Sequence, residues 1–96
     1  MISKIDIISR RQEIIALATR HGASNIRIFG SVARGDASEN SDLDLIVRFE
    51  PGRSLLDHGA LLMDLRDLLG VKVDVIDEEA MRPRFRQQAI AEAVPL

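Results

Sequence analysis

The stretch Gly30-Ser31-Val32-Ala33-Arg34-Gly35-Asp36, followed by Ser41-Asp42-Leu43-Asp44-Leu45, decides the fold of this 96-residue chain. A glycine-serine pair after an apolar segment is typical of a turn between a strand and a short helix, where backbone N–H groups can bind phosphate. The two aspartates lie one residue apart in an alternating segment, so their side chains share one face of a strand. Two carboxylates on one face suit Mg²⁺, which prefers oxygen ligands and substrate phosphates.

The alternation of apolar and polar residues runs from Asp42 to Phe49 and predicts the best strand of the chain. Leu43, Leu45 and Val47 form its apolar face, which helices must cover. We expect the face of Asp42 and Asp44 to be open, because buried unpaired carboxylates are costly.

Hydrophobic spacing on either side of this strand predicts the other elements. Helices are expected over residues 3–20, 31–34, 54–69 and 84–93, and further strands over 25–29 and 71–76. Ile5, Ile8, Ile15 and Ala18 are expected on one face of the first helix, and Ser31 is expected to cap the short second one. The order predicts an α/β (α+β) fold, with a small mixed three-stranded sheet flanked by helices in one domain over residues 1–96.

Composition narrows the class of protein. The net charge of −2 and the presence of three Phe with no Trp or Tyr argue against direct nucleic-acid binding. There is no cysteine, and no apolar run approaches the roughly 20 residues that span a bilayer. No signal-peptide pattern stands at the amino terminus. We therefore expect a cytoplasmic protein without a membrane segment.

Asp74 is a third candidate, since it stands inside the apolar segment Val73-Asp74-Val75-Ile76. If its strand neighbours that of Asp42 and Asp44, Asp74 could be a metal ligand or a general base toward an attacking hydroxyl. An aspartate that faces water from an edge strand is an equally good interpretation. Taken singly, the Gly30-Ser31 turn and the aspartate pair also have ordinary structural explanations.

Together, Gly30-Ser31, ten intervening residues, Asp42-Leu43-Asp44 and the later Asp74 resemble the DNA polymerase beta nucleotidyltransferase superfamily, and its minimal nucleotidyltransferase (MNT) branch in particular. The resemblance implies the nucleotidyltransferase core fold. It implies that Gly30 and Ser31 hold the triphosphate, with Arg34 near the phosphates or shaping the loop. Asp42, Asp44 and Asp74 would bind Mg²⁺, expected as two ions, and Asp74 would activate the acceptor hydroxyl. The implied reaction transfers AMP from ATP and releases pyrophosphate.

The same resemblance implies a partner, because MNT proteins of this size often accompany a HEPN-domain ribonuclease toxin and adenylylate one of its tyrosines as the antitoxin. Two alternatives stay open. A transferase that acts on a small molecule such as an aminoglycoside would need a second domain, which this chain lacks. A non-catalytic toxin-binding module would have no reason to keep three converging carboxylates.

Two surface features have no assigned role. Residues 81–86, Met-Arg-Pro-Arg-Phe-Arg, concentrate arginines and are either a docking surface for an acidic partner or phosphate, or a solvated helix start. The leucine-rich stretch 55–69 first predicts core packing, and any excess of leucine would indicate a homo-oligomer interface. His58 within that stretch is expected to be structural.

Overall fold

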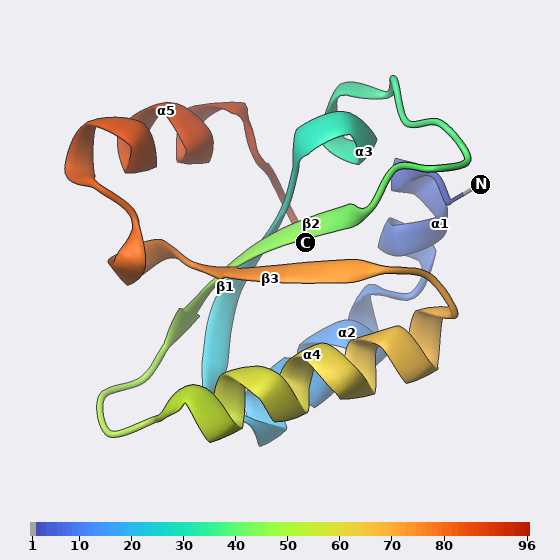
Figure 1. Ribbon diagram of the computed structural model, residues 1–96. Helices are drawn as coiled ribbons and strands as arrows, with labels where there is room; N and C mark the ends of the chain where they lie inside the picture. The colour runs from blue at the N-terminus through green and yellow to red at the C-terminus, as the bar shows by residue number, and fades with distance from the viewer. Residues whose placement is uncertain (1) are drawn as a thin grey trace.

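A four-stranded mixed sheet is the centre of the computed structural model, which describes residues 2–96 (Figure 1). The strands are β1 (Ala23–Phe29), β2 (Leu43–Phe49), β3 (Val73–Asp77) and β4 (Val94–Pro95), in the spatial order β3-β2-β1-β4. β1 is antiparallel to both β2 and β4, whereas β2 and β3 are parallel. The predicted mixed α/β architecture is confirmed, but the predicted count of three strands is wrong.

The fourth strand is short. Val94 and Pro95 pair with Ile28 and Arg27 at the edge of the sheet, a position where a proline is tolerated because no ladder N–H is needed. Two residues carry no measurable alternation, so a periodicity argument cannot detect them. The segment at Pro95, predicted to be the end of a helix, is therefore a short strand that pairs with the outer edge of β1.

Helices cover the two faces of the sheet unequally. The helices are α1 (Lys4–Ser9), α2 (Arg11–Arg20), α3 (Gly30–Arg34), α4 (Leu55–Leu69) and α5 (Pro83–Glu92), with a short 3-10 helix, η1, at Glu78–Ala80. Figure 1 shows α2 and α4 along one side of the sheet, and α3 and α5 on the other. In the part of the chain that the structure describes, no helix is both long and apolar enough to cross a bilayer.

The predicted first helix is broken at Arg10. Its backbone leaves the helical region at φ −110° and ψ 18°, which ends α1 and starts α2. The guanidinium of Arg10 donates to the carbonyl of Leu68 over 2.9 Å. This contact holds the junction against the end of α4, and no local sequence pattern predicts it.

The break changes which side chains reach the core. Ile5 is 78% exposed, and Ile8 and Ile15 are more than one third exposed, so the apolar face expected from their spacing does not pack as a whole into the core. Burial of Ala18 is confirmed. Within α1 and α2, the isoleucines that reach the core are Ile7 and Ile14, both fully buried.

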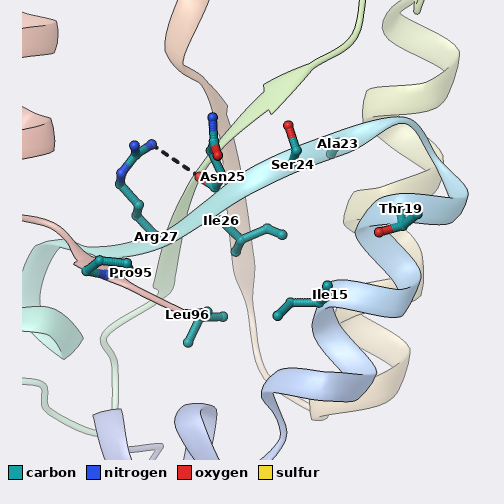
Figure 2. A pocket seen from close by; sticks show the side chains of 9 residues that line it. All are labelled: Ile15, Thr19, Ala23, Ser24, Asn25, Ile26, Arg27, Pro95 and Leu96. Atoms are coloured by element: carbon teal, nitrogen blue, oxygen red, sulfur yellow. Dashed lines mark hydrogen bonds between the residues drawn. The ribbon is translucent and has the colours of Figure 1, made fainter.

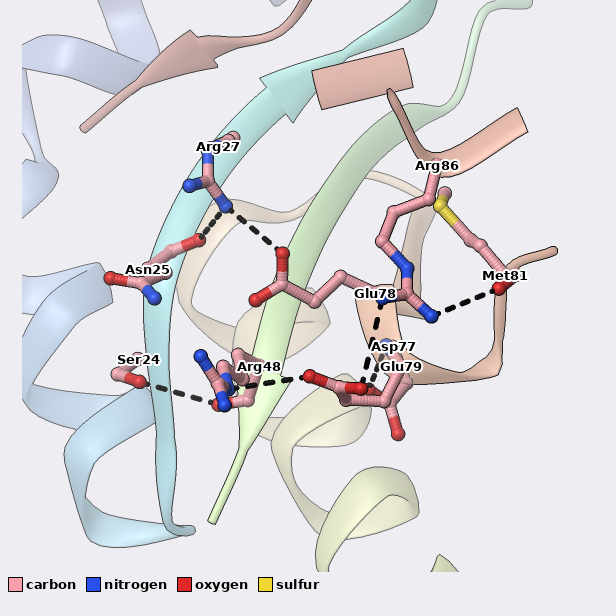
Figure 3. Close-up of polar contacts among 9 residues, drawn as sticks. All are labelled: Ser24, Asn25, Arg27, Arg48, Asp77, Glu78, Glu79, Met81 and Arg86. Carbon is pink, nitrogen blue, oxygen red and sulfur yellow. Dashed lines mark hydrogen bonds and ion pairs between the residues drawn. The ribbon is translucent and has the colours of Figure 1, made fainter. Parts of the chain in front are cut away.

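The apolar face of β2 is as predicted, since Leu43, Leu45 and Val47 are fully buried in the main core cluster. On the opposite face, Asp44 is half-buried and Arg48 is exposed. Ile46, two residues after Asp44 on that face, is also fully buried. Arg27 pairs with Ile46 in the ladder and reaches across β2 to Glu78 (Figure 3).

α4 begins and ends as its sequence predicts. Ser54 is its N-cap and forms a capping box with Asp57, and Gly70 ends it in the left-handed region at φ 68°. Leu61 and Leu65 are buried against the sheet. The remaining leucines at the start of the helix stay exposed.

Candidate active site

The turn at Gly30, which follows β1, forms one side of the candidate site. Gly30 adopts φ 75°, a left-handed conformation that disfavours other residues, and α3 starts there directly. The N-cap is Phe29, so the prediction that Ser31 caps this helix is wrong. Ser31 lies inside the first turn, where backbone N–H groups have no partner within the helix.

Gly30 lies against Asp44. A Cβ built on Gly30 would stand 2.5 Å from Oδ2 of Asp44, which is closer than real Cβ contacts allow. The ladder explains this proximity, because Phe29 is paired with Asp44. The predicted phosphate-binding turn and a predicted metal ligand are therefore neighbours in space.

Asp44 and Asp74 are partners in the parallel ladder between β2 and β3. Their side chains point away from the core because the flanking residues, Leu43 and Val73 among them, are fully buried on the other face. β3 is an edge strand and Asp74 is exposed. Asp74 therefore faces water from an edge strand, and its strand also neighbours that of Asp44, which is the condition on which a role as metal ligand or general base depends.

The electrostatics of this region centre on Asp44. Burial raises the pKa of its carboxyl above the ordinary value, and the charge of Asp74 and then that of Asp42 raise it further. A hydrogen bond with Asp74 acts in the same direction, whereas the charge of Arg34 opposes it. The site therefore holds an excess of negative charge that a bound cation would relieve.

Asp42 lies just before β2, at the margin of this group. It lines a polar hollow of about 350 Å³ together with the segment 38–41 and Lys72. Among residues 2–96, no three His, Cys, Asp or Glu side chains already converge as a finished metal cage. The structure brings Asp44 and Asp74 together and leaves Asp42 near them. These carboxylates are the hard oxygen donors that Mg²⁺ prefers when phosphates and waters complete its shell.

Arg34 closes the short helix α3. Its Nε donates to Oδ2 of Asp36 over 3.2 Å in the polar loop that leads to β2. Its charge also acts on Asp44. The contact with Asp36 fits the expected loop-shaping role, and the influence on Asp44 shows that Arg34 lies within electrostatic reach of the carboxylates.

Lys72 is the polar residue of this region that the sequence reasoning missed. It lines the same hollow as Asp42 and precedes Asp74 by two residues. The sequence could have indicated Lys72, because residues two apart on a strand share a face and Lys72 stands two residues before Asp74.

A second hollow, of about 300 Å³, lies at the opposite edge of the sheet between α2, β1 and β4 (Figure 2). Ile15, Ile26 and Leu96 contribute apolar side chains to it, and Arg27 there donates to the carbonyl of Asn25 over 3.2 Å. It contains no carboxylate pair, so it is a weaker candidate for an active site than the region of Asp44.

Comparison with known proteins gives relatives over most of the chain. The family model of the nucleotidyltransferase domain matches residues 11–96. A Methanocaldococcus jannaschii protein, MJ0435, provisionally assigned as a protein adenylyltransferase, is 38% identical over 84 residues, which cover 88% of this chain and 90% of that protein. The protein adenylyltransferase MntA of Thermococcus cleftensis is 37% identical over 78 residues, which cover 81% of this chain and 79% of that protein.

Solved structures share the architecture. One that is provisionally described as a minimal nucleotidyltransferase is 50% identical, with a TM-score of 0.90 over 99% of this chain and 97% of that chain. A crystal structure of a toxin–antitoxin with AMP-PNP is 24% identical, with a TM-score of 0.74 over 88% of this chain and 69% of that chain. At this lower identity the likeness shows the fold alone.

Proposed function

Since this chain belongs to the nucleotidyltransferase domain family and is an enzyme of the nucleotidyltransferase class, we propose that it transfers AMP from ATP to a hydroxyl group of a partner protein. The observation that carries the proposal is the contact between the Gly30 turn and Asp44, with Asp74 alongside. Two relatives named as protein adenylyltransferases support a protein as the acceptor. The nucleotidyltransferase fold predicted from the sequence is confirmed.

The donor end of the reaction rests on Gly30 and Ser31. In our proposal their backbone N–H groups hold the triphosphate, because a glycine allows close approach and the first turn of α3 leaves donors free. Arg34 supports this end, either by contact with a phosphate or by holding the loop through Asp36.

We assign activation of the acceptor hydroxyl and binding of the metal to the three carboxylates. The acceptor oxygen attacks the α-phosphorus, the bond from that phosphorus to pyrophosphate breaks, and Asp74 takes the hydroxyl proton. Asp42, Asp44 and Asp74 would hold Mg²⁺, as two ions in our proposal, and their excess negative charge supports this assignment. Bound Mg²⁺ would neutralise charge on the reacting phosphates.

The acceptor that we propose is a tyrosine of a HEPN-domain ribonuclease toxin, with this chain as the cytoplasmic antitoxin. The support is the MNT-type motif from Gly30 to Asp44 and the 37% identity with MntA. The exposed start of α4, with Leu55 and Leu56, supports an additional contact with another copy.

The test is transfer of label from ATP that carries radioactive α-phosphate to a co-purified partner. Asp42→Ala with Asp44→Ala is expected to lower labelling on the order of 100-fold or more while the circular dichroism spectrum is unchanged. Asp67→Ala with Glu92→Ala is the matched control, since both residues are exposed acids outside the site.

Equal labelling by the double variant at Asp42 and Asp44 would contradict the assignment. Label on an aminoglycoside in the absence of a protein acceptor would favour the small-molecule alternative. Toxin neutralisation by the double variant, with all labelling lost, would favour a module that acts by binding.

A further inference from the structure

The start of α5 carries arginines where a helix disfavours them. Arg82 is its N-cap, Arg84 and Arg86 follow within the first turns, and the first turn holds no acidic residue and no side-chain cap. The N-terminal end of a helix has a partial positive charge that repels cations. The stability of α5 alone therefore gives no reason for these arginines.

Only one of the three arginines has its charge compensated. Arg86 places Nη1 3.9 Å from Glu79 and donates from Nη2 to the carbonyl of Met81 (Figure 3). Arg82 and Arg84 are exposed, and neither forms an ion pair with any residue between 2 and 96. Two cations beside a positive helix end thus remain available to a ligand.

Phe85 stands between these arginines and is 53% exposed. It follows Arg84 directly in the first turn of α5 and lies three residues after the N-cap Arg82, so all three exposed side chains belong to the same end of the helix. Exposing half of a phenylalanine forgoes favourable burial. We define Arg82, Arg84 and Phe85 as the α5 patch, a surface that combines positive charge with an aromatic ring.

The α5 patch belongs to the same side of the sheet as the carboxylates. Arg48 follows Asp44 by four residues on β2, so both face that side, about 13 Å apart. Glu79 lies within 3.4 Å of Arg48 and also pairs with Arg86 at the start of α5 (Figure 3). In Figure 1, α5 and α3 accordingly stand on one side of the sheet, opposite α2 and α4.

We propose that the α5 patch binds an acidic segment of the protein acceptor, with carboxylates on Arg82 and Arg84 and an apolar side chain on Phe85. The proposal rests on the proposed function in that the acceptor is a protein. Charge complementarity selects this occupant. A nucleic acid fits less well, because the chain has a net charge of −2 and the patch offers two uncompensated cations and one ring.

The test measures binding without ATP or Mg²⁺, by fluorescence anisotropy. The probes are a labelled short peptide of Glu, Asp and Phe and its counterpart with Gln and Asn. Arg82→Glu with Arg84→Glu is expected to weaken binding of the acidic peptide about tenfold or more. Arg11→Glu with Arg20→Glu on α2, which changes the net charge equally, is expected to weaken it less than about twofold.

The thermal midpoint separates this role from a structural one. Glutamates suit a helix N-terminus, so the Arg82 and Arg84 variant is expected to unfold at the same temperature as the wild type or higher. Phe85→Ser keeps both arginines and is expected to weaken binding on its own.

Three outcomes would overturn the proposal: no saturable binding of the acidic peptide to the wild type, equal loss in the α5 and α2 variants, or tighter binding of an oligouridylate RNA that is lost in the α5 variant. Because ATP is absent, none of these results bears on AMP transfer. Retained peptide binding with no transfer to any protein would refute the proposed function instead.

Discussion

Asp44 and Asp74 are paired across the parallel strands β2 and β3, and their proximity makes the charge of each unfavourable for the other. Burial is the first cause of the raised pKa of Asp44, and the charge of Asp74 is the second. The isolated fold thus carries a local electrostatic cost at the place where the proposed chemistry needs a cation.

This cost predicts the pH dependence of stability. Because the pKa of Asp44 is higher in the folded state than its ordinary value of 3.8, the folded protein binds that proton more tightly than the unfolded chain. The free energy of unfolding therefore falls as pH rises from about 4 through the raised pKa. In the absence of Mg²⁺, Asp44→Asn is expected to raise the thermal midpoint near pH 7 by roughly 2–5 °C.

Thermal denaturation with a chelator present checks this at two pH values. Near pH 3 both states are largely protonated at Asp44, so the gain from Asp44→Asn is expected to vanish. Asp67→Asn, an exposed aspartate on α4, serves as the control. A gain of the same size near pH 3 would show that the effect does not come from ionisation of Asp44.

The break between α1 and α2 predicts opposite outcomes for adjacent residues. Ile14 is fully buried and Ile15 is 37% exposed. Ile14→Ala is expected to lower the free energy of unfolding by about 3 kcal/mol, and Ile15→Ala by less than about 1 kcal/mol. Urea denaturation measures both. Losses of equal size would contradict this prediction and favour one unbroken helix with Ile15 on its buried face.

The capping box of α4 predicts a smaller effect. The hydroxyl of Ser54 accepts from the N–H of Leu56 over 3.2 Å, so Ser54→Ala is expected to cost about 1 kcal/mol in the free energy of unfolding. Ser24→Ala on the exposed part of β1 is the comparison, and its effect should be near zero. A Ser54→Ala protein as stable as the wild type would mean that packing of α4 makes its cap dispensable.

The ion pair between Arg27 and Glu78 can be measured by a double-mutant cycle. Glu78 is 7% exposed and lies 3.5 Å from Arg27. Glu78→Gln leaves the half-buried Arg27 without its counter-charge, and about 1–3 kcal/mol of stability should be lost. Arg27→Met alone and Arg27→Met with Glu78→Gln complete the cycle, and the double variant should lose less stability than the two single variants combined. Strictly additive effects in urea denaturation would show that the two side chains do not interact.

Much of the fold could be predicted from the sequence where the periodic signal is long. The strand from Leu43 to Phe49 alternates over its whole length, and α4 is bounded by Ser54 and Gly70, so local chemistry determines both elements. The turn at Gly30 was found for the same reason, although the helix that follows it begins one residue earlier than expected.

The predictions from the sequence are wrong where contacts between residues far apart in the chain determine the structure. The break at Arg10 depends on the carbonyl of Leu68, and β4 exists because β1 offers an edge to Val94. The pairing of Asp44 with Asp74 depended on strand order, which spacing along the chain does not specify. For that reason the candidate residues could be listed from the sequence, but their proximity could not.

The absence of a side chain at Gly30 has an evolutionary consequence. A methyl group there would collide with the carboxylate of Asp44, in addition to the strain of φ 75° on any larger residue. The collision disappears if Asp44 is replaced by glycine, so the cost of Gly30→Ala depends on which residue stands at position 44. The two positions are therefore epistatic, and a lineage that loses the carboxylate also loses one of the two constraints that keep the glycine.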